Sequence, residues 1–197
     1  MDIRVHPLVA RLEGALAGRT PQLAERDEPF KEAAVALVVR PVSDDDAELL
    51  FIRRATREGD PWSGQIGLPG GRFDRTDDSL QTTALRETME EVGLDLRAHG
   101  HLLGALDELR PRTPVLPPII VRPYVAAIAH APALVLSDEV AEARWVRLSS
   151  LFVPGAKVRT TVQVRDYRMQ VDAYQQGDFT IWGMTERILS TFEGIWR

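Results

Sequence analysis

The chain has 197 residues, of which 44% are hydrophobic and 27% charged, as expected for one globular domain with a full core. Its formal net charge of −5 argues against nucleic-acid binding, and the lack of cysteine excludes disulfides, thiolate zinc sites and cysteine nucleophiles. Since no apolar run approaches the roughly 20 residues of a membrane helix and no signal segment follows Met1, we expect a cytoplasmic protein with no membrane partner.

The first third of the chain predicts a helix followed by a β-hairpin. The apolar pattern of residues 6–16 predicts an opening helix that ends near Gly18. A polar connector over residues 19–31 leads to predicted strands at residues 33–40 and 49–53, which a turn joins into a hairpin. The strand-like residues 65–68 then lead into the turn Pro69-Gly70-Gly71, where glycine lets the backbone approach a ligand closely.

Next in the chain, a helix is predicted between Ser79 and Gly93. Three consecutive polar residues offer N-cap chemistry, namely Asp77, Asp78 and Ser79. Gly93 suits the left-handed residue that ends many helices. An apolar stripe at i, i+4 and i+7 is predicted to face the core and consists of Leu85, Met89 and Val92.

Three glutamates of this helix are predicted to share the face opposite that stripe. Glu87, Glu90 and Glu91 stand at i, i+3 and i+4, and such a cluster is costly unless a cation neutralises it. Arg86 is four residues before Glu90 and can pair with it. Carboxylate oxygens suit Mg²⁺, so we expect the metal site of a phosphate-cleaving enzyme; the alternative is an ordinary solvated face.

The second half predicts further strands and a closing helix. Residues 102–106, 119–128 and 143–148 are predicted strands, with a proline-rich, exposed loop at residues 110–118. Residues 161–164 and 168–171 predict a late hairpin, and residues 180–192 a C-terminal helix. Strands mixed with two or three helices indicate a single α/β domain over residues 1–197, a sandwich around a mixed sheet.

The stretch from Gly70 to Leu94 resembles the Nudix hydrolases. Their box is a glycine, five residues, a glutamate, seven residues, then Arg-Glu-apolar-x-Glu-Glu-x-Gly-apolar. Over about residues 71–94 the matches are Arg86, Glu87, Glu90, Glu91, Gly93 and Leu94. The resemblance implies the Nudix α/β/α fold, with N-terminal and C-terminal helices as extensions, and attack of water on a diphosphate linked to another group.

Three positions depart from the pattern. Asp78 stands where the first glutamate is expected, and its shorter side chain alters the contact to Arg86 while keeping the charge. Thr88 stands at an apolar position. Gly71 is one residue too far from the helix, so we expect a one-residue insertion in the loop between them.

Upstream of the box the chain resembles the coenzyme A pyrophosphatases of this family. These carry a segment like L-L-x-x-R-[Ser/Ala], an arginine, and then Gly-Gln-Ile-x-Phe-Pro-Gly-Gly; here residues 49–55 and 64–71 read LLFIRRA and GQIGLPGG. Leu68 replaces the phenylalanine and Asp60 the second arginine, for which Arg57 substitutes only if the loop shifts. Residues 181–185, IWGMT, also resemble this group.

The resemblance assigns roles to the box residues. Glu90 and Glu91 are the expected principal ligands of Mg²⁺, with Mn²⁺ as the alternative ion, and Glu87 is a ligand or the general base. The Gly71 carbonyl adds a further ligand, and Arg86 orients the glutamates.

Other residues are candidates for substrate binding and for a base outside the box. The candidates for phosphate contacts are Arg54, Arg57, Arg72 and Gly70, since guanidinium groups suit phosphate oxygens. Glu139 and Glu142 are the candidate distal bases, and the alternative for Glu142 is a turn cap before the Trp145 strand. Trp62 either stacks on an adenine or packs as a plug, while Trp182 and Met184 are expected in the core.

Three functions stay open at this point. The first is Mg²⁺-dependent hydrolysis of coenzyme A, or a derivative, to 4′-phosphopantetheine and adenosine 3′,5′-bisphosphate. The second keeps the chemistry on nucleoside di- or triphosphates or nucleotide sugars, which the residue at position 60 and the residue 59–63 insert favour. The third is a non-catalytic nucleotide-sensing Nudix domain, which the three retained glutamates disfavour. The resemblance also allows a homodimer, although no sequence feature locates an interface.

Overall fold

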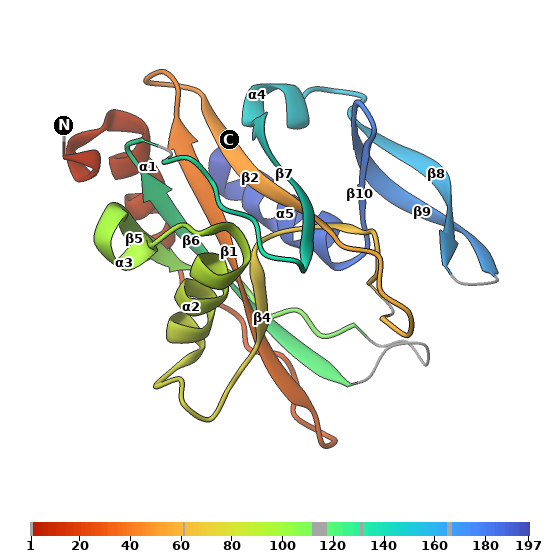
Figure 1. Ribbon diagram of the computed structural model, residues 1–197. Coiled ribbons are helices and arrows are strands. Elements are labelled where there is room, and N and C mark those ends of the chain that lie inside the picture. The colour runs from red at the N-terminus through yellow and green to blue at the C-terminus, as the bar shows by residue number, and fades with distance from the viewer. Residues whose placement is uncertain (1, 61, 112–117, 131, 165–166) are drawn as a thin grey trace.

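The computed structural model describes residues 2–60, 62–111, 118–130, 132–164 and 167–197. Within these ranges a mixed sheet of seven strands forms the centre of the molecule, in the order β3-β2-β1-β6-β5, with β4 added to β1 and β7 to β2 (Figure 1). The strands are β1 (Lys31–Pro41), β2 (Ala47–Arg54), β3 (Ile66–Gly67), β4 (Gly70–Arg72), β5 (Gly100–Ala105), β6 (Ile119–Ile128) and β7 (Val140–Arg147).

Strand β1 lies at the middle of this sheet and explains the long apolar run in its sequence. It pairs antiparallel with β2 and β4 and parallel with β6, for example Ala33 opposite Val121. Helices cover both faces of the sheet, so alternate β1 residues enter two different cores, Leu37 one and Val38 the other. The predicted hairpin of the first two strands is confirmed.

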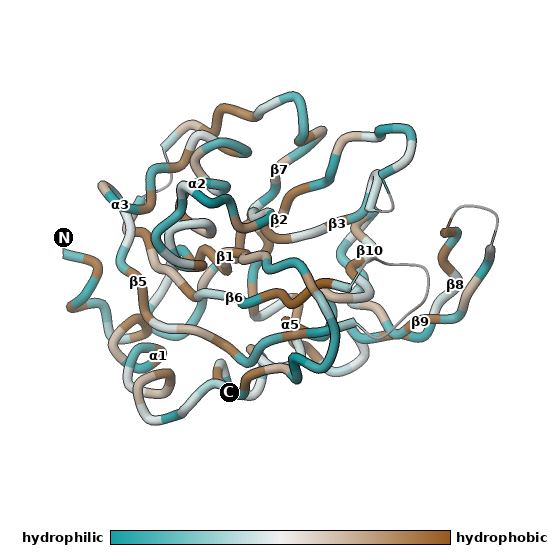
Figure 2. The backbone as a smooth tube through the Cα atoms, turned by 90° about the horizontal axis from the view of Figure 1, so that it is seen from below, coloured by the Kyte–Doolittle hydropathy of each residue, from teal (hydrophilic) through white to brown (hydrophobic). Residues whose placement is uncertain are grey.

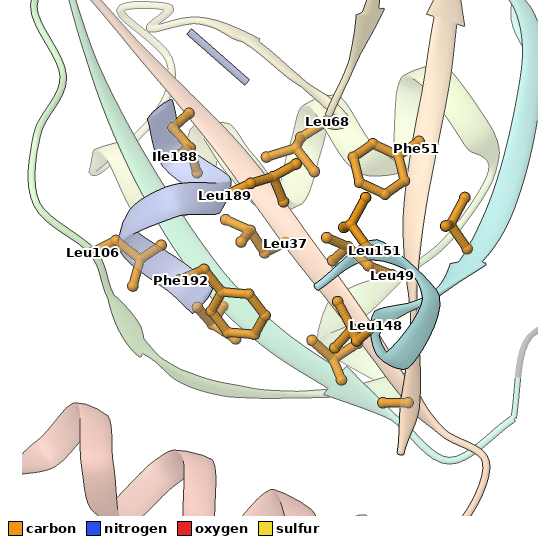
Figure 3. Close-up of a cluster of buried hydrophobic side chains, with 14 of the residues drawn as sticks. Leu37, Leu49, Phe51, Leu68, Leu106, Leu148, Leu151, Ile188, Leu189 and Phe192 are labelled. Carbon is orange, nitrogen blue, oxygen red and sulfur yellow. The ribbon is translucent and has the colours of Figure 1, made fainter. Parts of the chain in front are cut away.

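The two cores lie on opposite faces of the sheet. One contains α1 (Pro7–Ala17), α4 (Leu148–Leu151) and α5 (Met184–Trp196), with Leu189 and Phe192 of α5 beside Leu37 and Leu49 (Figure 3). The other lies beneath α2 (Leu80–Val92) and α3 (Leu96–His99). In Figure 2 the hydrophobic colour follows the central strands, while much of α2 is hydrophilic. The predicted α/β/α sandwich around a mixed sheet is confirmed.

A smaller sheet, set apart from the main one in Figure 1, was predicted only in part. Its strands are β8 (Lys157–Val164), β9 (Tyr167–Gln176) and β10 (Phe179–Trp182), and the late hairpin was expected. The helix predicted over residues 180–192 starts too early: Thr180 pairs with Gln175 of β9, and α5 begins only after Gly183, whose φ is 70°. The chain turns at this glycine because left-handed backbone suits glycine best. A single-turn 3₁₀ helix, Ile3–Val5, precedes α1.

The caps of α2 confirm the sequence prediction, and its buried face confirms it in part, since Val92 is buried and Leu85 packs against the same core. Ser79 accepts a hydrogen bond from the Thr82 N–H, and Gly93 is left-handed with a φ of 70°. Met89, expected in the core, is 50% exposed. The face turned to the sheet consists of Leu80, Thr83, Ala84, Thr88, Glu91 and Val92. Packing has therefore rotated α2 so that one glutamate is buried and the predicted single acidic face is split.

Residues 112–117 of the loop predicted at residues 110–118, which include two of its four prolines, lie outside the described residues. Arg110, at its start, is 9% exposed and donates to the Glu25 carbonyl at 2.6 Å, so this end is not exposed as predicted. Within the described ranges, no helix is long and apolar enough to cross a membrane.

Candidate active site

The glycine turn predicted to approach a ligand lies directly against α2. Gly70 and Gly71 begin β4 and pair with Val35 and Ala34 of β1. A Cβ at Gly70, whose φ is 154°, would collide with the backbone of β1, and a Cβ at Gly71 would collide with the Glu87 carboxyl group. Glycine at position 71 therefore lets the carboxylate reach the backbone of the turn.

Glu91 is the buried acid of the site. Its Oε2 accepts a hydrogen bond from the Gly70 N–H at 2.8 Å, and only 3% of the residue is exposed. Burial raises the pKa of Glu91 to about 7, against the hydrogen bond from Gly70 and the charge of Arg54, which lower it. The Arg54 Nη1 atom is 3.8 Å from Glu91 Oε1. A cation bound nearby would therefore stabilise the charged form of this carboxylate.

Arg86 holds the acids around it in position. Its Nη1 atom donates to Glu90 Oε2 at 2.9 Å, as predicted, and lies 3.0 Å from Glu87 Oε1. Its Nε and Nη2 atoms donate to the two carboxylate oxygens of Asp77 at 3.0 and 2.9 Å. Nη2 also donates to the Arg72 carbonyl at 3.2 Å, which ties the helix to the end of the glycine turn. A two-pronged contact of this kind fixes the orientation of the guanidinium.

The prediction that Asp78 takes the place of the first box glutamate is wrong, because Asp77 does so. Asp77 is 6% exposed and accepts a further hydrogen bond from the Thr83 hydroxyl at 2.8 Å, whereas Asp78 is exposed. The Arg86 hydrogen bonds lower the pKa of Asp77 to about 2. Counted from Asp77, Gly71 stands at the family spacing. The extra residue therefore falls between Asp77 and Arg86, and not between Gly71 and the acid.

The three box glutamates do not converge as one cluster. Glu90 has 58% of its side chain exposed and pairs with Arg86. Within the described ranges, no three acidic or histidine side chains form a ready-made metal site. Glu87, Glu91 and Glu139 line a common cavity. Burial is the main cause that raises the pKa of Glu87 and of Glu91, and the negative charge of Glu139 raises both further. A divalent cation bound between Glu87 and Glu91 would relieve the repulsion among these carboxylates.

This cavity has a volume of about 630 Å³, within the usual size of ligand sites. The sheet and α5 supply an apolar wall that includes Val121 and Ile188. Trp182 and Met184, expected in the core, line the cavity, and Met184 also packs against the core as predicted. Trp62 lines the cavity as well.

Among the predicted substrate-binding residues, Arg54, Arg72 and Gly70 line this cavity. Arg57 is not among the lining residues; its guanidinium pairs with Glu139 at 2.9 Å and with Asp138 at 3.1 Å. Sequence reasoning missed Arg187, which also lines the cavity. Starting the C-terminal helix at residue 184 would have put residues 184, 187 and 188 on one face, and this spacing was the available signal.

The two candidate distal bases have different surroundings. Glu139 lines the cavity, and its backbone carbonyl accepts from the Ala55 N–H at 2.8 Å. Glu142 does not line it: within strand β7 it pairs with Arg53 at 3.2 Å and with Arg144 at 3.0 Å. Glu142 lies in the same strand as Trp145, so the turn-cap alternative is wrong too.

Fold and site together define an α/β enzyme with a carboxylate-lined cavity of nucleotide size. Residues 31–167 match the family model described as NUDIX domain, and the chain belongs to the Nudix hydrolase family. It is therefore an enzyme that acts on phosphorus-containing anhydrides, and enzymes of this family generally use divalent metal ions.

Similar proteins fall within the same family or leave their activity unnamed. The mitochondrial coenzyme A diphosphatase NUDT8 of Homo sapiens is 30% identical over 181 residues, 89% of this chain and 72% of that protein. The peroxisomal coenzyme A diphosphatase ndx-8 of Caenorhabditis elegans is 36% identical over 112 residues, 54% and 45% of the two chains. The uncharacterized protein C14C4.10c of Schizosaccharomyces pombe is 40% identical over 118 residues, which are 58% of this chain but only 36% of that protein.

Among solved structures, the MutT/nudix family protein from Enterococcus faecalis has the same fold. The TM-score is 0.57 at 21% identity, over 94% of this chain and 68% of that chain. At this identity the likeness concerns the fold alone. In sequence, the chain is similar to the coenzyme A diphosphatases named above.

Proposed function

We propose that this Nudix hydrolase cleaves the diphosphate of coenzyme A or a derivative, with water, to 4′-phosphopantetheine and adenosine 3′,5′-bisphosphate. The observation that carries the proposal is the cavity in which Glu87, Glu91 and Glu139 lie together with Arg72 and Arg187, two arginines that form no ion pair with another described residue. Acids for a metal and cations for phosphates are both needed when the substrate is a multiply charged anion. The coenzyme A diphosphatases among the relatives support this choice of substrate.

The donor set fits a divalent cation, Mg²⁺ or in its place Mn²⁺. Glu87 and Glu91 would hold it, together with the carbonyl of Gly71, the residue whose missing side chain leaves room for the Glu87 carboxyl group. Glu90 would join them only after leaving Arg86. When bound, such an ion offsets the charge of the diphosphate and lowers the pKa of a coordinated water.

The residues of the chain have separable roles in this proposal. Arg86 keeps Glu87 in place, and the Gly70 N–H keeps Glu91 in place. Glu139 is the preferred general base, because it lines the cavity, where it pairs with Arg57, whereas Glu142 lies outside the cavity and pairs with Arg53. Arg54 shares its charge between Asp60 at 3.1 Å and Glu91, so it neutralises the acids more than it serves a phosphate.

One observation favours a second class of substrate. Asp60 stands at the place of the second arginine of the coenzyme A group and pairs with Arg54, while Arg57 is bound to Glu139. Neither arginine is therefore free at that place, as recognition of a coenzyme A phosphate there would require. Nucleoside di- or triphosphates and nucleotide sugars stay the alternative substrates.

A substrate panel with product analysis tests the proposal. The purified chain is incubated with coenzyme A, nucleotide sugars and nucleoside triphosphates, with Mg²⁺, with Mn²⁺ and with excess EDTA, and products are separated by chromatography. We expect coenzyme A to give the two named products at the highest kcat/KM, and EDTA to stop the reaction. Glu139→Gln should lower kcat by about 10²–10⁴, whereas its matched control Glu142→Gln should stay near the parent. A higher kcat/KM on a nucleotide sugar would replace the substrate, and equal activity of both variants would remove Glu139 as the base.

Two sequence predictions accompany this proposal. A cytoplasmic location stays a prediction, and the two named coenzyme A relatives carry peroxisomal and mitochondrial names. A homodimer also stays a prediction, which analytical ultracentrifugation of the purified chain would test.

A further inference from the structure

A second cavity adjoins the first on the side of the smaller sheet. Its volume is about 410 Å³, and five residues line both cavities, namely Asp60, Gln65, Ile66, Val164 and Trp182. The remaining wall comes from the end of β2, the loop before β3, the end of β8 and the β9–β10 segment. Both volumes fall in the range of roughly 300–1,000 Å³ that ligand sites occupy. The two cavities are neighbouring compartments of one cleft.

The charged groups of the second cavity are all paired. Arg53 donates to Asp178 at 2.7 Å, and Asp178 also accepts from Arg144 at 2.7 Å. Asp60 accepts from Arg54 at 3.1 Å. Of the residues that line this cavity and are described, none is a cation without an acidic partner. A phosphate here would lose water and meet two aspartates with no spare positive charge, which is unfavourable.

The other polar groups on this wall are neutral. Hydroxyl and amide side chains line it, namely Ser63, Gln65, Gln163 and Thr180, and such groups both donate and accept hydrogen bonds. The first cavity differs, since its Arg72 and Arg187 form no ion pair with any residue in the described ranges. The cleft thus separates a compartment in which two arginines remain available to phosphates from one suited to a neutral, hydrogen-bonding group.

We propose that the second cavity binds the neutral, amide-bearing arm attached to the diphosphate, while the nucleotide half lies in the first cavity. This inference rests on the proposed function, because the pantetheine arm of coenzyme A carries amide and hydroxyl groups along an otherwise apolar chain. Ile66 and Trp182, at the border of the two cavities, offer apolar surface to its methylene groups. The arm passes from the diphosphate into the second cavity over these two side chains.

Filling the second cavity tests the assignment. Thr180 lines the second cavity but not the first, and a β-strand position accepts an aromatic residue, so Thr180→Trp occupies the space. Thr161→Trp is the matched control, because Thr161 lies in the same sheet and lines neither cavity. The hydroxyl groups of both threonines form a hydrogen bond with a glutamine, Thr161 with Gln170 at 2.6 Å and Thr180 with Gln175 at 3.0 Å. Gln163→Trp fills the same cavity from β8 and carries the test if Thr180→Trp does not fold.

The probes are pantetheine, coenzyme A and adenosine 3′-phosphate 5′-diphosphate, which lacks the arm. Pantetheine binding is followed by saturation-transfer NMR with competition, and the other two by turnover. We expect each filling variant to weaken pantetheine binding at least about tenfold and to raise the KM for coenzyme A by a similar factor. The KM for the armless nucleotide should not change, and Thr161→Trp should behave as the parent throughout.

Three results separate the possible failures. Pantetheine binding that is undetectable in the parent, or unchanged in both filling variants, overturns the assignment of the second cavity. An equal rise of the KM for coenzyme A and for the armless nucleotide also overturns it, since the damage then lies in the first cavity. If the parent does not hydrolyse coenzyme A while pantetheine still binds and both filling variants abolish that binding, the proposed substrate is wrong and the neutral site stands.

Discussion

Replacing Asp77 by Asn should destabilise the protein much more than replacing its neighbour Asp78. The Asp77 carboxylate is buried, bonded twice to Arg86 and once to Thr83, and its pKa is lowered from 3.8 to about 2. At about 1.4 kcal/mol for each tenfold change in the proton dissociation constant, this carboxylate adds about 2 kcal/mol to the free energy of unfolding. Asp78 is exposed, so Asp78→Asn should change stability by less than about 0.5 kcal/mol.

The pH dependence has a definite sign. A carboxylate with a lowered pKa in the folded state contributes its full stability above about pH 4, and the contribution is lost as the pH falls through about 2. Urea unfolding at pH 7 should therefore show a midpoint about 1 M lower for Asp77→Asn than for the parent, taking a slope of about 2–3 kcal/mol/M. The difference should shrink between pH 4 and pH 2. An unchanged midpoint for Asp77→Asn, or a larger decrease of the midpoint for Asp78→Asn, would refute the assignment of Asp77 as the carboxylate that pairs with Arg86.

Three other predictions concern the first cavity. Gly71→Ala should fold, because the flexible Glu87 side chain can move away, but it should lower kcat about 10²-fold. In Gly70→Ala the new methyl group meets the backbone of β1, so urea titrations should show a free energy of unfolding lower by about 2–4 kcal/mol. The pKa of Glu91 is raised to about 7, so its charge lowers the free energy of unfolding above pH 7 and has no effect below about pH 4.5. Without metal, Glu91→Gln should therefore melt at a higher temperature than the parent at pH 8 but not at pH 4. The same variant should lose activity. Arg187→Gln should raise the KM for the nucleotide substrate about tenfold without changing the melting temperature, and an unchanged KM would remove Arg187 from the phosphate site.

Local spacing predicted much of the site, because spacing on one helix or in one turn is a property of the sequence. Arg86 and Glu90 are four residues apart on α2 and do pair, and Gly71 does lie against Glu87. Spacing could not distinguish Asp77 from Asp78, since both precede the helix and a one-residue insertion can fall on either side of them. The choice was made by burial: only one of the two reaches Arg86 from beneath the helix.

The sequence by itself determined the family, the alternation of strands and helices, and the acidic helix that follows a glycine turn. Only the tertiary structure decided which way α2 faces, so that Glu91 is buried while Glu90 is exposed. It also brought residues near positions 53, 60, 163 and 180 together around the second cavity, and put Arg187 into the first. The physical reason is that periodicity sets only the relative angles of side chains about their own axis. The direction in which an element faces is set by packing against strands that are distant in the chain.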